Sequence, residues 1–148
     1  MPLLFTCLFL GLLEAGCATD PGENRQLDVE VGRAHFRSYC SACHQYDGHG
    51  MGEAPPLDGS PWVMGSQERL IKIVLHGVRG RLEVGGVIYD REMPGVGKVL
   101  SDRDLAALLS FVREHFGSSS EAVTPDAVRL VREANRDRTA YWDLDDLR

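Results

Sequence analysis

The chain has 148 residues, a length that corresponds to one domain. Its hydrophobic content of 43% and aromatic content of 7% are ordinary for a globular protein, so composition alone assigns no function. The formal net charge of -6 excludes an electrostatic attraction to nucleic acid or to an anionic membrane surface, and suits a partner with a basic docking surface.

The N-terminus contains an apolar run from Leu3 to Leu13, which suits the core of a secretory signal and is too short for a membrane span. No Lys or Arg precedes it. We interpret residues 1–17 as a signal peptide or lipoprotein leader and expect export to the periplasm. Small residues before Cys17 resemble a bacterial lipoprotein cleavage site, which would leave an acylated Cys17 as a membrane tether. Ordinary cleavage just after Cys17 or Ala18, which leaves a soluble protein, is the alternative.

Residues 18–27 are polar and acidic and have no apolar period, so we predict a linker. The first helix is expected over residues 28–39. Gly32 lies inside this helix, where glycine costs about 0.5–1 kcal/mol relative to alanine. Its presence indicates that another element approaches the helix backbone closely.

The segment Cys40-Ser41-Ala42-Cys43-His44 follows this helix and is the attachment pattern of a c-type haem. One turn carries both sulfurs to the two vinyl groups of a porphyrin, and His44 lies under the iron as proximal ligand. A structural zinc site needs four ligands, but Cys7 and Cys17 lie in or beside the leader. A thioredoxin-like redox pair needs a βαβ setting. The motif therefore predicts one covalently bound haem c.

The next segment is interpreted as the turn that leaves the haem. Gly48-His49-Gly50-Met51-Gly52 lacks the Lys-Ser/Thr ending and the preceding strand of a phosphate-binding loop. Trp62-Val63-Met64 forms an apolar cluster that is interpreted as pocket wall. Ser66 is the expected N-cap of a helix that ends at Gly77. The apolar stripe of this helix, which is expected to face the core or the pocket wall, consists of Leu70, Ile71, Val74 and Leu75.

Residues 81–88 alternate around Gly85-Gly86, which predicts a small β-hairpin that leads the chain toward Met93. Met93 lies among Glu, Pro and Gly residues rather than on an apolar stripe. We therefore favour Met93 as the sixth iron ligand over a core-filling role, which is the usual fate of methionine.

Four other side chains compete with Met93 for the iron. Met51 follows the proximal histidine too closely to cross the ring, and Met64 belongs to the apolar cluster. Ligation by His49 or His76 would give a lower-potential site. We expect His49 in a surface loop and His76 at a helix end, where imidazole is favoured.

A haem pocket also needs a polar edge for the propionates. Trp62, Arg79 and Arg81 are the candidates for this contact. For each of the three, a role in ordinary packing or as a surface charge has the same weight as a contact with a propionate.

The last part of the chain predicts two more helices. Ser101 caps a helix with Asp102 and Asp104 in its first turn and Gly117 at its end. Residues 118–123 form a predicted loop. Thr124-Pro125 then begins a short docking helix that carries Val128, Leu130 and Val131. We divide the chain into a haem domain over residues 28–117 and a C-terminal extension over residues 118–148.

From about Val29 to Phe116 the chain resembles a class I cytochrome c. In such proteins an N-terminal helix packs on a C-terminal helix. A Gly and an aromatic residue of the first helix contact a Leu and an aromatic residue of the second. Gly32 with Phe36, and Leu108 with Phe111, match that arrangement. The resemblance implies a mainly α, class I cytochrome c fold with a small β-hairpin and a C-terminal helical extension.

A narrower resemblance is to bacterial cytochromes c that accompany periplasmic quinoprotein dehydrogenases. It is carried by residues 55–60, by Pro61-Trp62-Val63, by residues 76–80, and by a tail with a Val-rich helix and an ending rich in Arg, Trp and acidic residues. By this resemblance, the backbone carbonyl of Pro55 or Pro56 accepts a hydrogen bond from the far nitrogen of His44.

These features predict an electron-transfer protein and not an enzyme. It would carry single electrons from a periplasmic dehydrogenase to a downstream oxidase or carrier, with a fairly high potential from Met/His ligation. The alternative is a haem enzyme or gas sensor with a labile sixth ligand. A third interpretation shares the chemistry but makes the chain a fixed subunit of a dehydrogenase complex, with the tail helix and Trp142 as the interaction surface.

Overall fold

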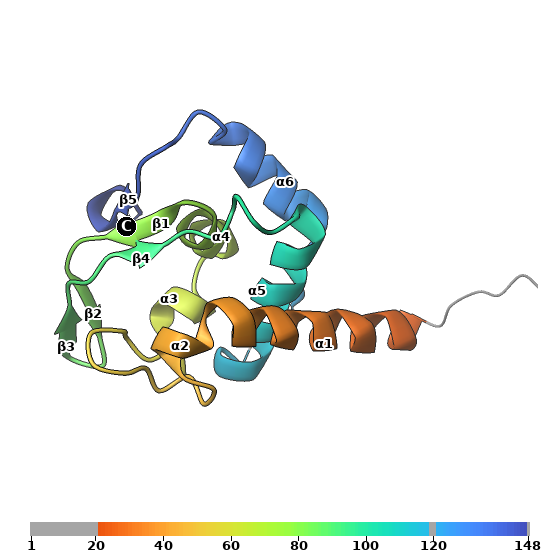
Figure 1. The fold of residues 1–148 in the computed structure, drawn as a ribbon, viewed down its shortest axis with the longest axis horizontal. Coiled ribbons are helices and arrows are strands. Elements are labelled where there is room, and N and C mark those ends of the chain that lie inside the picture. The colour runs from red at the N-terminus through yellow and green to blue at the C-terminus, as the bar shows by residue number, and fades with distance from the viewer. Residues whose placement is uncertain (1–20, 119–120, 148) are drawn as a thin grey trace, which may run out of the picture.

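The structure is a computed structural model that describes residues 21–118 and 121–147 (Figure 1). The predicted leader and Cys17 therefore lie outside the described residues. The helices are α1 (Pro21–Tyr39), α2 (Ser41–His44), α3 (Pro61–Met64), α4 (Gln67–His76), α5 (Asp102–Phe116), α6 (Pro125–Ala134) and the 3-10 helix η1 (Leu144–Leu147). The strands are β1 (Gly77–Arg79), β2 (Leu82–Val84), β3 (Val87–Tyr89), β4 (Met93–Pro94) and β5 (Trp142–Asp143). Over these residues, no helix has the length and apolar character that a membrane crossing requires.

The crossing of α1 and α5 organises the core. A Cβ added to Gly32 would collide with the backbone carbonyl of Ala107 and lie 2.8 Å from the Cβ of Phe111. Phe36, which is 1% exposed, packs its ring 5.6 Å from that of Phe111 and 5.1 Å from that of Phe116, between centroids. The close backbone approach expected at Gly32 is confirmed, because only a residue without a side chain allows this contact.

The helix α1 begins earlier than the sequence analysis expected. Residues 21–27, interpreted as a linker, are helical. Extending an existing helix requires no new nucleation, so a polar segment joins it even without an apolar stripe. Arg25 also forms an ion pair with Glu114 of α5 at 3.6 Å, which adds a contact between the two helices.

Side-chain caps begin three helices where the sequence predicts them. The hydroxyl oxygens of Ser66, Ser101 and Thr124 accept hydrogen bonds from the backbone N–H groups of Arg69 (3.3 Å), Asp104 (3.2 Å) and Ala127 (3.2 Å). Gly77 follows α4 with a φ of +83°, a conformation that favours glycine and ends the helix.

Two small sheets follow α4. The hairpin of β2 and β3 pairs Val84 with Val87 across Gly85-Gly86, whose φ angles are +59° and +79°. Positive φ at both turn residues is the geometry of a tight hairpin, so the predicted hairpin is confirmed. The second sheet has the order β4-β1-β5 and was not predicted. In it β1 pairs antiparallel with β4 and parallel with β5.

The C-terminal extension packs on the rest of the domain. Val128 of α6 is 0% exposed, whereas Leu130 is 58% exposed and lies off the docking face, since it is only two residues further along the helix. Arg132 of α6 pairs with Asp102 at 2.7 Å and donates to the carbonyls of Gly97 and Leu100. Figure 1 shows the chain after α6 crossing back to place β5 beside β1. The predicted mainly α class, with a small hairpin and a helical extension, is confirmed.

Candidate functional site

The two-cysteine motif forms one helical turn directly after α1. The backbone N–H of Cys40 donates to the carbonyl of Phe36 at 2.9 Å, and that of His44 donates to the carbonyl of Cys40 at 2.9 Å. Cys40 is half-buried and Cys43 is exposed, and both are free thiols. Burial, assisted by the neighbouring Cys43, raises the pKa of Cys40 to about 11, so this sulfur is a thiol at neutral pH. Within the described residues, no group of three or more His, Cys, Asp or Glu side chains is placed to hold a metal ion.

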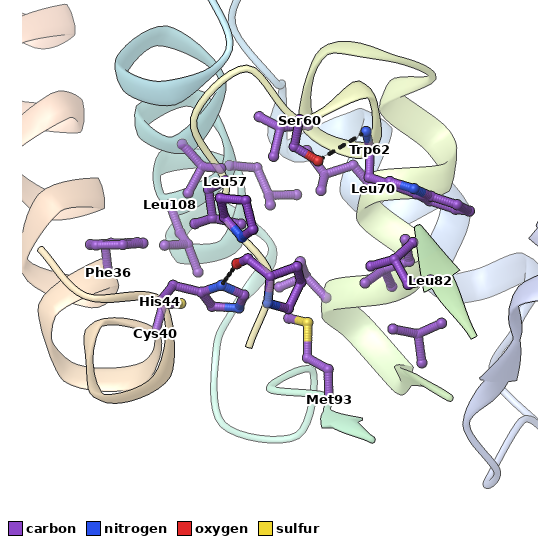
Figure 2. A pocket seen from close by; sticks show the side chains of 18 of the residues that line it. Phe36, Cys40, His44, Leu57, Ser60, Trp62, Leu70, Leu82, Met93 and Leu108 are labelled. Atoms are coloured by element: carbon purple, nitrogen blue, oxygen red, sulfur yellow. Dashed lines mark hydrogen bonds between the residues drawn. The ribbon is translucent and has the colours of Figure 1, made fainter. Parts of the chain in front are cut away.

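Beside this turn lies a pocket with an almost wholly apolar lining, as small-molecule and cofactor sites usually have. Figure 2 shows side chains from both ends of the haem-domain sequence converging on it. Its walls come from α1, α4 and α5, through Phe36, Leu70, Val74, Leu108, Leu109 and Val112. The apolar stripe predicted for α4 therefore serves both the core and the pocket.

His44 points into this pocket and is only 6% exposed. Its Nδ1 lies 3.0 Å from the carbonyl oxygen of Pro55. Because a carbonyl only accepts, Nδ1 carries the proton and donates it, which leaves the lone pair of Nε2 free to bind a metal. Burial lowers the pKa of His44, while the hydrogen bond to Pro55 opposes this shift. The ring is thus held neutral, as a metal ligand must be.

A glycine in the following loop permits that hydrogen bond. Gly50 has a φ of +75°, and a Cβ at this position would lie 2.8 Å and 2.9 Å from the carbonyl carbon and oxygen of Pro55. The backbone N–H of Gly50 donates to the carbonyl of His44 at 3.0 Å. Of the two carbonyls left open by the sequence, that of Pro55 accepts the bond, and both prolines line the pocket.

Met93 lines the same pocket from β4 and points into it (Figure 2). Its backbone position is set by the pairing with Val78 of β1. The competing methionines lie elsewhere: Met51 is 59% exposed and Met64 is 44% exposed. The interpretation of Met64 as pocket wall is wrong, since its neighbours Trp62 and Val63 line the pocket and it faces outward.

The two competing histidines are also outside the pocket. His49 lies in an exposed loop, where it contacts Asp47. His76 ends α4 and contacts the edge of the Trp142 ring, with centroids 6.5 Å apart. Burial, followed by the charges of Arg138 and Arg132, lowers the pKa of His76. Its expected place at a helix end is confirmed.

The three candidates for the polar edge have different surroundings. Trp62 lines the pocket, and the guanidinium of Arg69 lies 4.4 Å from its ring centroid. Arg79 forms a two-pronged ion pair with Asp143, at 2.8 Å and 3.0 Å, which gives it a partner in the C-terminal extension. Arg81 is exposed and is not among the residues that line the pocket. The structure thus brings only Trp62 of the three to the main pocket wall.

Sequence reasoning missed Leu144, which lines the pocket from the C-terminal extension and is 4% exposed. It follows β5 directly, and β5 is placed beside the site by its pairing with β1 and by contacts of Trp142 with α4. A two-residue strand has no periodicity to detect, so no local signal in the sequence indicates this contact.

Comparisons with known proteins agree with this geometry. Residues 27–112 match the family described as cytochrome c oxidase, cbb3-type, subunit III. Cytochrome c-552 of Thermus thermophilus is 32% identical over 93 residues, which make up 60% of this chain and 70% of that protein.

Two dehydrogenase subunits are similar over a comparable stretch. The fructose dehydrogenase cytochrome subunit of Gluconobacter japonicus is 31% identical over 109 residues, 68% of this chain and 22% of the subunit. The cytochrome c subunit of the quinone alcohol dehydrogenase of Gluconacetobacter polyoxogenes is 30% identical over 104 residues, 64% of this chain and 20% of the subunit. The matched stretch is thus about a fifth of each subunit.

Proposed function

The chain belongs to the class I c-type cytochromes, and from this premise we propose that it carries single electrons between a periplasmic dehydrogenase and a downstream oxidase or carrier. The relatives, a cytochrome c-552 and the cytochrome subunits of two dehydrogenases, point to electron transfer and not to catalysis. The proposal adds one haem c bound covalently through Cys40 and Cys43, with His44 and Met93 as the iron ligands.

The observation that carries the proposal is the convergence of His44 and Met93 on one apolar pocket beside the two cysteines. The residues present fit a haem. His44 has a free Nε2 because Pro55 takes the proton of Nδ1, and the apolar walls suit a porphyrin ring. When bound, haem c supplies an iron that alternates between the ferrous and ferric states. With His44 and Met93 both binding the iron, the chain would leave no position for a substrate, which favours a carrier over an enzyme.

A second opening supports the idea that electrons pass at the pocket edge. Cys43, Tyr89 and Glu92 line it together with His44 and Met93. Arg91 and Glu53 form an exposed ion pair at 2.8 Å on its rim. A redox partner that covers this opening would approach the site without entering it. The dehydrogenase subunits among the relatives support a dehydrogenase as donor, and the predicted leader supports a periplasmic location with or without a lipid on Cys17.

The test is the absorption spectrum of the reduced, haem-loaded protein with and without carbon monoxide. We expect the wild type to be low-spin and unreactive, because Met93 fills the sixth position. The Met93→Ala variant should bind carbon monoxide. Met51→Ala is the matched control, since its side chain is exposed and lies outside the pocket.

Binding of carbon monoxide by the wild type would contradict Met93 ligation and favour the haem enzyme or gas sensor. A fixed dehydrogenase subunit would instead copurify with its complex from native membranes, whereas a mobile carrier would separate from it.

A further inference from the structure

The C-terminal extension reaches the methionine side of the pocket through the sheet of β4, β1 and β5. Val78, at the centre of β1, pairs with Met93 on one side and with Trp142 on the other. Only β1 therefore lies between β4, which carries Met93, and β5 of the C-terminal extension. The match to the family model covers residues 27–112, so β1 and β4 lie inside the matched residues and β5 lies outside them.

Leu144 follows β5 and becomes part of the pocket itself. It lines both the main pocket and the second opening, as Val78 and Met93 also do. It is only 4% exposed, so its side chain is packed in place rather than lying over the surface. Leu144 thus forms part of the same apolar wall as Met93, in a region that is closed to water.

Several contacts hold this end of the chain in position. Asp143 accepts two hydrogen bonds from Arg79 of β1. The guanidinium of Arg138 lies 3.4 Å from the ring centroid of Trp142. The ammonium group of Lys72 in α4 lies 5.4 Å from the same centroid. Gly77 leaves room for the Tyr141 ring, which a Cβ would approach to 2.5 Å. These contacts join residues 138–143 to α4 and β1.

We propose that residues 138–144, here called the C-terminal clamp, keep the methionine side of the pocket closed, with Leu144 as the positioning residue that shields Met93. This inference rests on the proposed function. The clamp acts in two ways: β5 braces β1, which holds the Met93 strand, and Leu144 excludes water from the methionine side. Water stabilises the more highly charged ferric site, so shielding favours the reduced state and raises the reduction potential.

The test compares Leu144→Ala with Leu147→Ala in the full-length, haem-loaded protein. Both leucines lie in η1 and are buried, at 4% and 8% exposure, but only Leu144 lines the pocket. We expect Leu144→Ala to raise the carbon monoxide-reactive fraction of the ferrous protein about tenfold, to weaken the methionine-to-iron absorption band of the ferric protein and to lower the reduction potential. Leu147→Ala should leave all three unchanged.

Two further variants separate shielding from general loss of stability. Leu144→Met conserves volume and should restore the wild-type potential and spectrum. If Leu144→Ala does not fold, Leu144→Val removes one methylene and should shift the same three measurements in the same direction by a smaller factor. Circular dichroism of each protein checks that the fold is retained.

The outcomes distinguish this inference from the proposed function. A wild type that already binds carbon monoxide contradicts Met93 ligation itself. A wild type that is inert, together with a Leu144→Ala protein that is equally inert and has an unchanged potential, overturns the clamp alone. Equal shifts in Leu144→Ala and Leu147→Ala also overturn it, because they show that the clamp acts only through stability.

Discussion

At the scale of single residues, the proximal side of the site depends on a glycine as much as on the histidine. The ring of His44 is useful as a ligand only because Pro55 takes its Nδ1 proton. That carbonyl reaches His44 because Gly50 leaves space for the backbone of residues 54 and 55. A loop glycine thus sets the orientation of a metal ligand six residues before it in the chain.

This arrangement predicts the effect of Gly50→Ala. The new Cβ would collide with the Pro55 carbonyl and weaken its hydrogen bond to His44. The histidine then becomes a less basic ligand, so we expect the reduction potential to rise, and we expect the free energy of unfolding to fall by about 1–3 kcal/mol from overpacking, in addition to backbone strain. Potentiometric titration and chemical denaturation measure the two effects.

Gly52→Ala is the matched control for backbone strain. Gly52 also has a positive φ, +60°, but nothing lies within 4 Å of an added Cβ. It should cost only the left-handed strain, about 1–2 kcal/mol, and leave the potential unchanged. Equal potentials for Gly50→Ala and the wild type would contradict the role assigned to the Pro55 carbonyl.

At the scale of elements, helix caps and one helix crossing position the pocket walls. Ser101 begins α5, the helix that supplies Leu108, Leu109 and Val112 to the pocket. Its hydroxyl accepts from the backbone N–H of Asp104 and donates to the carboxylate of Asp104 at 2.6 Å. His35 of α1 lies 3.3 Å from the other oxygen of that carboxylate, so the cap also connects the two crossing helices.

These contacts give α5 a predictable dependence on pH. The hydrogen bond from Ser101, followed by the contact with His35, lowers the pKa of Asp104 below its ordinary value of 3.8. A carboxylate whose pKa is lower in the folded state stabilises that state above pH 3.8, and the contribution is lost as the pH falls through the folded-state value.

Ser101→Ala should therefore lower the free energy of unfolding at neutral pH by about 0.5–2 kcal/mol through loss of the cap. It should also reduce the difference in stability between neutral pH and pH values below 3.8, since Asp104 loses its largest stabilising partner. Denaturation curves at both pH values test this, with Ser38→Ala as a control at an exposed serine inside α1. An unchanged acid dependence would show that the Ser101–Asp104 contact does not set the pKa.

At the scale of the whole molecule, the core and the pocket are one structure. Phe36, Leu70, Leu108 and Val112 belong to the buried core and also line the pocket. The apolar residues therefore pack against one another on one side and toward the cofactor on the other. A small domain buries a limited fraction of its surface, so a bound haem completes its core.

Removal of the haem should therefore loosen the tertiary structure. We expect a Cys40→Ala/Cys43→Ala protein, which cannot attach haem covalently, to retain helical far-ultraviolet circular dichroism but to lose cooperative unfolding and to bind a hydrophobic dye. The single variants, which keep one attachment point, should lie between this protein and the wild type. Cooperative unfolding of the double variant at the wild-type temperature would contradict a core that depends on the cofactor.

Features that depend on local chemistry can be predicted from the sequence. The attachment motif, the three serine and threonine caps, the Gly-Gly hairpin and the close approach at Gly32 each depend on a few neighbouring residues or on the conformational freedom of one glycine. The polar surroundings of Met93 in the sequence predict an iron ligand rather than a core residue, and in the structure Met93 lines the pocket.

The folded chain sets the features that depend on contacts between distant segments. It selected Pro55 over Pro56, turned Met64 outward, continued α1 through the predicted linker and paired Arg79 with Asp143. It also brought Leu144 into a pocket whose other lining residues begin at Phe36, more than a hundred residues earlier. A strand of two residues such as β5 has no pattern of its own, because its stability comes from the strand beside it.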